Sequence, residues 1–266
     1  MNTKTIISIV TLIAISVFSV FSCSTIPQAA NPPVVVKKPV VKPKKYEVNL
    51  TSGQIQDRAN KINGIATECM MNEFYLNPIN KIRWQKVEGM SDGRHGIDGL
   101  YVKIVDGIVK DVLVAESKWN RSRLGSTKNK TVKQMSKQWI LNKLKEVDVK
   151  DSQRAIYKQI TQYVEKGIYR GILFNLKPSG ELLKIYLYTI KSKNDNNAIE
   201  KTKGRVISIN LHHPQNRFFA SLIDSFDRCR VMAIKEKLPM LDDGDIKELL
   251  SDGYVEGSDI EKVLNQ

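Results

Sequence analysis

Residues 96–119 read GIDGLYVKIVDGIVKDVLVAESKW and contain two apolar runs, 97–105 and 109–118. Asp106-Gly107 separates these runs, and an Asp-Gly pair between apolar segments is a strong signal for a β-hairpin. We therefore expect two antiparallel strands at the centre of a sheet.

The flanking sequence alternates between helical and extended patterns. Residues 52–76 carry apolar side chains at helical spacing, as at Ile55, Ala59 and Ile62. A second predicted hairpin surrounds Pro178-Ser179-Gly180. The other predicted helices are 131–146, 151–166, 215–235 and one near Ile246, and the other predicted strands are 81–87, 169–176, 181–190 and 204–211. This order predicts an α/β (α+β) fold with a mixed β-sheet flanked by helices.

The chain is strongly basic. Its 266 residues include 42 Lys and Arg against 28 Asp and Glu, for a formal net charge of +14, and 41% of them are hydrophobic. This composition suits a globular core and excludes an acidic disordered chain. Residues 118–145 contain nine basic side chains and no acidic one. Nucleic acid is therefore the expected partner, because its phosphates attract such a surface.

Chemistry-bearing residues gather at the ends of the two central strands. Glu116 and Lys118 are two residues apart, so the pleat of a strand directs both to one face. Asp98 lies at the opening of the neighbouring strand, between Gly96 and Gly99. Two carboxylates on adjacent strands make an oxygen-rich site suited to Mg²⁺, with Mn²⁺ as a substitute.

A shared metal also constrains the pairing of the two strands. A two-residue Asp106-Gly107 turn pairs residue 105 with residue 108, which sets Asp98 opposite residue 115 and turns Glu116 to the other face. Sharing of one ion requires Asp98 opposite Glu116 instead. We therefore predict either a three-residue loop over 106–108 or a β-bulge that restores this register.

Three ordered motifs resemble a known family. Residues 96–101 (GIDGLY), 114–118 (VAESK) and 133–140 (KQMSKQWI) are similar to motifs of the PD-(D/E)XK nuclease superfamily, and most of all to nuclease modules of bacterial polymorphic toxins. The resemblance covers about residues 52–190. It implies a restriction-endonuclease-like core and, as a partner, an inhibitor or immunity protein.

The same resemblance implies a role for each site residue. Asp98 and Glu116 would bind the metal, and Lys118 would orient or activate the attacking water. Gln134, expected on the helix 131–146, would position water or substrate. A further catalytic glutamate, also a ligand of the metal, would come from the first helix, where Glu68 matches best and Glu73 is the alternative.

The first 22 residues resemble an export signal. Lys4 precedes an uncharged apolar stretch, and Val20-Phe21-Ser22-Cys23 is similar to a lipoprotein cleavage motif in which Cys23 becomes lipidated. An ordinary cleaved signal and an uncleaved anchor are the alternatives. We therefore expect a lipid-anchored protein of the bacterial cell envelope, facing the periplasm or the exterior, or a secreted one.

The expected organisation has four parts. The signal occupies residues 1–22, and Cys23 begins a tether over 23–46 that is rich in proline and lysine. A nuclease-like core over 47–212 precedes a helical extension, 213–266, with an acidic tail.

The expected function is hydrolysis of phosphodiester bonds by a metal-dependent nuclease, acting on DNA more than on RNA. The alternative is a non-catalytic envelope lipoprotein that binds nucleic acid or an envelope partner.

Cys69 and Cys229 can pair in an oxidising compartment or remain free thiols, and the sequence leaves both alternatives open. Trp119 is expected to contact substrate, whereas Trp139 is expected in the core.

Overall fold

The computed structural model describes one compact unit of the chain. The described residues are 45–46, 49–77, 79, 84–87, 96–127, 130–194, 196–251 and 254–266. The predicted signal and Cys23 lie outside these residues, as does the tether apart from 45–46. Within the described part of the chain, no helix is both long and apolar enough to cross a lipid bilayer.

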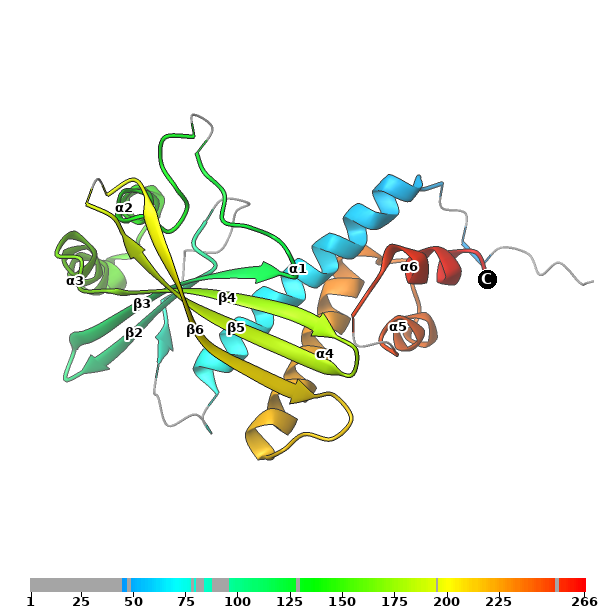
Figure 1. Ribbon diagram of the computed structural model, residues 1–266. Coiled ribbons are helices and arrows are strands. Elements are labelled where there is room, and N and C mark those ends of the chain that lie inside the picture. The colour runs from blue at the N-terminus through cyan, green and yellow to red at the C-terminus, as the bar shows by residue number, and fades with distance from the viewer. Residues whose placement is uncertain are drawn as a thin grey trace, which may run out of the picture. The chain divides into compact units, whose positions relative to one another are not determined.

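A six-stranded mixed sheet forms the centre of the unit, with its strands in chain order from one edge to the other (Figure 1). All neighbouring strands are antiparallel except β3 and β4, which are parallel. The strands are β1 (Gln85–Lys86), β2 (Gly99–Val105), β3 (Ile108–Trp119), β4 (Arg170–Ser179), β5 (Leu182–Ser192) and β6 (Ile199–Asn210). The predicted mixed sheet flanked by helices is confirmed.

Helices cover the two faces of the sheet to different extents. The long helices α1 (Ser52–Leu76) and α4 (Arg217–Lys237) pack on one face. The shorter helices α2 (Lys137–Glu146) and α3 (Arg154–Glu165) cover part of the other. These two helices form the crossover that a parallel β3–β4 pair requires.

Helix α1 begins where its sequence provides a cap. The Thr51 hydroxyl accepts a hydrogen bond from the Gln54 amide, and the Gln54 side chain accepts one from the Thr51 amide. This capping box satisfies two backbone donors that a helix start leaves without partners. The helix runs from Ser52 to Leu76, so the predicted helix over 52–76 is confirmed at both ends.

Strand β3 alternates between two apolar cores. Leu113 and Ala115 point toward α1 and α4, whereas Val112 and Val114 point toward α2 and α3. This alternation follows from the two-residue repeat of a strand, and it places β3 between the two cores. The same repeat continues into the polar residues at the end of β3.

A disulfide between Cys69 and Cys229 joins α1 to α4, with a Cα–Cα distance of 5.7 Å. Of the two alternatives that the sequence left open, the structure shows the paired one.

Leu222 and Phe226 of α4 lie in the same core as the sheet, so this helix is packed against the strands. The last helices, α5 (Asp243–Leu249) and α6 (Gly257–Leu264), pack against the first turns of α1.

Candidate functional site

The register of β2 and β3 brings Asp98 next to Glu116. Asp106 and Gly107 have φ values of 51° and 73°, and this turn pairs Val105 with Ile108. Such values at both central positions define the tight hairpin turn that an Asp-Gly pair favours.

A β-bulge then changes the register. Lys103 pairs with Asp111 and Ile104 with Val109, so Lys110 is an extra residue on β3. Beyond the bulge the pairing runs to Gly99 opposite Ala115, which sets Asp98 level with Glu116. The predicted bulge is confirmed, and the alternative of a three-residue loop is wrong. The two carboxylates therefore sit at the same end of the hairpin.

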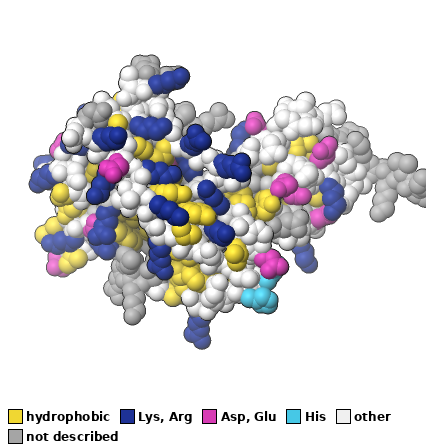
Figure 2. Space-filling model, viewed as in Figure 1, with side chains coloured by type: hydrophobic (Ala, Val, Ile, Leu, Met, Phe, Trp, Pro, Cys, Tyr) yellow, Lys and Arg dark blue, Asp and Glu magenta, His cyan; other side chains and the backbone are white. Residues whose placement is uncertain are grey.

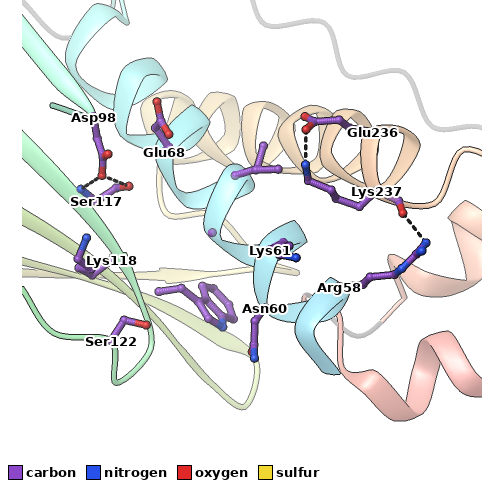
Figure 3. A pocket seen from close by; sticks show the side chains of 13 residues that line it. Arg58, Asn60, Lys61, Glu68, Asp98, Ser117, Lys118, Ser122, Glu236 and Lys237 are labelled. Carbon is purple, nitrogen blue, oxygen red and sulfur yellow. Dashed lines mark hydrogen bonds and ion pairs between the residues drawn. The ribbon is translucent and has the colours of Figure 1, made fainter. Parts of the chain in front are cut away.

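Asp98 is held at this end by the strand beside it. The amide and the hydroxyl of Ser117 both donate to Asp98 Oδ2, each at 2.8 Å (Figure 3). No pattern in the sequence pointed to a function for Ser117. Its function in positioning Asp98 depends on the pairing of the strands, which no local pattern reveals.

Glu116 is the most buried member of the group, with 2% of its surface exposed. Its Oε1 accepts hydrogen bonds from Lys118 Nζ, at 2.5 Å, and from Gln134 Nε2. Its Oε2 is buried and has no hydrogen-bond partner in the described part of the chain. Burial and the charge of Asp98 raise the pKa of the Glu116 carboxyl from 4.5 to about 8, although Lys118 acts to lower it. Burial and the Asp98 charge therefore outweigh the effect of Lys118 on this carboxyl.

Gln134 reaches Glu116 from a turn and not from a helix. Its Oε1 accepts from the Gly125 amide at 2.9 Å while its Nε2 donates to Glu116. The predicted helix over 131–146 is wrong at its start, because Met135 has a φ of 70° and the helix begins only after the Ser136 cap. Lys133 donates its amide to the Asn197 carbonyl, which ties this turn to the β5–β6 connection.

Glu68 approaches Asp98 from α1, on the other side of the sheet from Glu116. It lines a cleft of about 850 Å³ together with Asp98 and Lys118 (Figure 3). Burial, and then the charge of Asp98, raise the pKa of Glu68 to about 7, against the opposing effects of Lys86 and Lys118. The alternative, Glu73, instead accepts a hydrogen bond from Ser225 of α4 at 3.0 Å. Of the two glutamates, Glu68 is the one beside Asp98.

A second hollow, of about 580 Å³, lies on the α2 side. It is lined by Glu116, Gln134 and Trp139, and again by Asp98 and Lys118. Asp98 and Lys118 therefore line both hollows and stand where the two meet.

Basic side chains that sequence reasoning missed line the first cleft. Arg58 and Lys61 come from α1, and Lys237 comes from the end of α4. Lys61 lies seven residues before Glu68, which is two helical turns, so this spacing could have placed it on the same stripe. Lys237 had no comparable signal, since only the packing of α4 on α1 brings it there.

The two tryptophans differ as expected in burial. Trp139 is 7% exposed and belongs to the core between the sheet and α2. Trp119 is partly buried, lines the first cleft, and packs its ring 6.2 Å from that of Tyr254. The prediction of a core position for Trp139 is confirmed, and substrate contact by Trp119 stays a prediction.

Asp98 and Glu116 fit a hard divalent cation. In the described residues, no group of three or more His, Cys, Asp and Glu side chains is arranged to hold a metal ion. The pair nevertheless combines an unpartnered buried oxygen on Glu116 with mutual repulsion that raises its pKa. A cation would give this oxygen a partner and would weaken the repulsion between the carboxylates. Carboxylate oxygens are also the ligands that Mg²⁺ prefers.

Three comparisons with known proteins found no match. No protein-family model matches the chain, and neither a curated protein nor a solved structure matches it. The class defined by fold and site is an α+β protein with two carboxylates and a lysine at the ends of paired strands.

Proposed function

We propose that this chain is a metal-dependent nuclease that hydrolyses phosphodiester bonds of nucleic acid, with DNA favoured over RNA. The proposal is carried by the juxtaposition of Asp98, Glu116 and Lys118 at one end of the hairpin, which the bulge at Lys110 produces. Binding of nucleic acid alone has no need of buried carboxylates beside the phosphates. A restriction-endonuclease-like core, as implied by the sequence resemblance, is part of this proposal.

Asp98 and Glu116 are the residues proposed to hold the ion, Mg²⁺ or Mn²⁺. When bound, such an ion polarises a phosphate oxygen and lowers the pKa of a coordinated water. Gln134 fixes Glu116 Oε1 through its second hydrogen bond, to the Gly125 amide. A fixed carboxylate loses less freedom on binding than a mobile one, so Gln134 is assigned a positioning function.

Lys118 and Glu68 supply the remaining chemistry. The Lys118 ammonium lies against Glu116 and would stabilise negative charge that develops on the phosphate oxygens. Glu68 has a pKa of about 7, so near neutral pH its carboxyl is able both to hold and to release a proton beside Asp98. Water activation is assigned to Lys118, as the resemblance implies, and proton transfer to Glu68. Binding of the metal by Glu68, which the resemblance also implies, stays a prediction.

A digestion assay tests the proposal directly. The full-length chain is incubated with plasmid DNA, single-stranded DNA or RNA, in Mg²⁺, in Mn²⁺ or in a chelator. We expect cleavage that depends on the metal, at a higher rate on DNA. Binding without cleavage of any of these substrates in either metal would favour the alternative of a non-catalytic envelope protein.

We also propose that the protein is anchored in the bacterial envelope through Cys23. The Cys69–Cys229 disulfide supports export, because disulfides form and persist mainly outside the reducing cytoplasm. Cys23→Ser should abolish both lipid attachment and membrane partition of the mature chain. Mass spectrometry that found an unmodified mature terminus at another residue would reject the anchor and leave the nuclease proposal intact. A toxin-type function with an immunity protein stays a prediction of the resemblance.

A further inference from the structure

The face of the sheet that carries Lys118 continues beyond it across three more strands. Lys118 pairs with Asn175 of β4, Asn175 with Tyr186 of β5, and Tyr186 with Val206 of β6. Directly paired residues point to the same side, so this row runs from the candidate site across the open part of the sheet. Two strand spacings separate Lys118 from Tyr186, which is about 10 Å.

Aromatic and basic side chains occupy this open part. We call it the Tyr–Lys face and define it by Lys177, Lys184, Tyr186, Tyr188, Lys201 and Lys203. Helices α2 and α3 cover the neighbouring positions Leu173 and Ile190 but leave Val206 39% exposed. Figure 2 shows lysine and arginine side chains around apolar ones where Figure 1 draws β4, β5 and β6 in front of α1 and α4.

The two tyrosines form a pair of nearly parallel rings. Their centroids are 6.3 Å apart and their planes differ by 14°. Lys177 Nζ lies 5.0 Å from the centre of the Tyr186 ring, and Lys201 Nζ lies 3.8 Å from that of Tyr188. Each ring is thus accompanied by a positive charge that projects from a neighbouring strand.

The four lysines of the Tyr–Lys face have no acidic partner among the described residues. None of them forms an ion pair with any other residue in the described ranges. Burial and the positive charge of Lys177 lower the pKa of Lys201, so these cations oppose one another. Positive charge gathered in this way is complementary to a chain of phosphates.

We propose that the Tyr–Lys face binds a single strand of nucleic acid next to the cleavage site, with bases stacked on Tyr186 and Tyr188 and phosphates paired with the lysines. The proposal rests on the proposed nuclease function and specifies the form of its substrate. It accounts for tyrosine rings between lysines at a distance of two strands from Lys118.

A single strand fits this surface better than a duplex does. Bases in a duplex are stacked on one another and show their flat faces only at the ends, whereas an unpaired base can stack on an aromatic side chain. Stacking of a base is also stronger than an exposed contact between an ammonium and a ring. A base can therefore replace the Lys177 ammonium over Tyr186 and release it to a phosphate.

Binding in a chelator tests the proposal without any need for catalysis. Fluorescence anisotropy of the full-length chain is measured with a labelled single strand of about 12 nucleotides, as DNA and as RNA, and with the matching duplex. We expect the single strand to bind at least about tenfold more tightly than the duplex. Tyr186→Ala and Lys177→Ala should each weaken single-strand binding about tenfold.

Two control variants separate this result from loss of fold or of overall charge. Tyr186→Phe keeps the ring, and Lys191→Ala removes one charge from the opposite face of β5, so both should bind within about twofold of the parent. Thermal melting of each variant checks that it is folded. If Tyr186→Ala were to fail to fold, Tyr186→Phe with Lys177→Ala would still distinguish the outcomes.

Each result bears on one proposal. Equal binding of duplex and single strand, or unchanged binding by Tyr186→Ala, overturns the Tyr–Lys face as a single-strand site while metal-dependent cleavage is unaffected. Single-strand binding that depends on Tyr186, in a chain that cleaves nothing, supports the face and rejects the nuclease. Binding to vesicles of anionic phospholipid but not to the single strand assigns the face to a membrane surface and overturns the proposal.

Discussion

The two faces of the sheet are made by the same strands yet differ in what covers them. On the face under α1 and α4, apolar side chains continue from Leu113 to Ile209, and a disulfide joins the two covering helices. On the other face, apolar side chains stop after Val114 and Leu173, and Glu116 and Lys118 follow. The covered face therefore provides stability, while the partly open face has polar groups that a compact fold alone does not require.

The largest expected effect concerns the polar end of the open face. Asp98→Ala, Glu116→Ala and Lys118→Ala should each lower the cleavage rate by at least about a thousandfold, which corresponds to about 4 kcal/mol of barrier. Asp98 and Lys118 line both hollows, and Glu116 lines the second one beside them. Initial rates on a labelled substrate in Mg²⁺ measure the effect.

A matched control for this series is Glu146→Gln. Glu146 lines the second hollow but pairs with Lys143 at the surface of α2, so its loss should leave the rate nearly unchanged. If Glu146→Gln were as damaging as Glu116→Ala, the effect would reflect the general charge of the hollow and not the specific site.

Truncation of a core ring on the covered face should have the next largest effect. Phe174 is fully buried, with its ring centroid 5.7 Å from that of Phe74. Phe174→Ala should lower the free energy of unfolding by about 4 kcal/mol, whereas Tyr186→Ala on the open face should cost about 1 kcal/mol or less. Denaturant unfolding of both variants measures the difference. Similar losses would contradict the division between the two faces.

The disulfide is expected to stabilise the covered face by a smaller amount. Replacement of both Cys69 and Cys229 by Ser should lower the free energy of unfolding by about 2–4 kcal/mol, because the bond restricts the unfolded chain. A reducing agent should destabilise the parent similarly and leave the double variant unchanged. A parent that unfolds identically with and without reductant would show that the bond contributes nothing.

The smallest expected effect is on the pH dependence of stability. The pKa of Glu116 in the folded chain is about 8, above its ordinary 4.5, so folding favours the protonated form. Stability from this group is complete below pH 4.5 and is lost as the pH rises to 8. Relative to the parent, Glu116→Gln should therefore become steadily more stable as the pH rises from 5 to 8 in a chelator.

Addition of Mg²⁺ sharpens this last comparison. The parent should recover stability at pH 8, because an ion that binds only the folded chain stabilises it, while Glu116→Gln should recover less. Thermal or chemical unfolding measures the stability of each protein at pH 5 and pH 8, with and without Mg²⁺. A difference between parent and variant that does not change with pH would contradict the raised pKa.

Several elements were predictable because their signals are local. The helix α1, the Asp106-Gly107 turn and the hairpin around Pro178-Ser179-Gly180 all depend on residues close in sequence. The start of α2 was not predictable, because Met135 takes a left-handed conformation in a turn held by Lys133 and Asn197. The helical spacing of Met135 and Trp139 correctly indicated that both side chains are buried. It wrongly indicated that the backbone at Met135 is helical.

The candidate site divides in the same way. Placement of Glu116 and Lys118 on one face follows from the two-residue repeat of a strand, and so it was available from the sequence. The preference for Glu68 over Glu73 came from the sequence resemblance, whereas its physical reason is tertiary: Ser225 of α4 contacts Glu73, and Glu68 lies beside Asp98.

The sequence by itself determined the chemistry of the hairpin and the tightness of its turn, because both depend on side chains and backbone preferences within a few residues. Only the tertiary structure decided that Lys110 is the residue that bulges, and that Glu116 is buried against Gln134. It also decided that β4 lies parallel to β3 and carries the row from Lys118 to Tyr186. The physical reason is that register, burial and strand order arise from contacts between distant segments, whereas turn and pleat preferences act on neighbours in the chain.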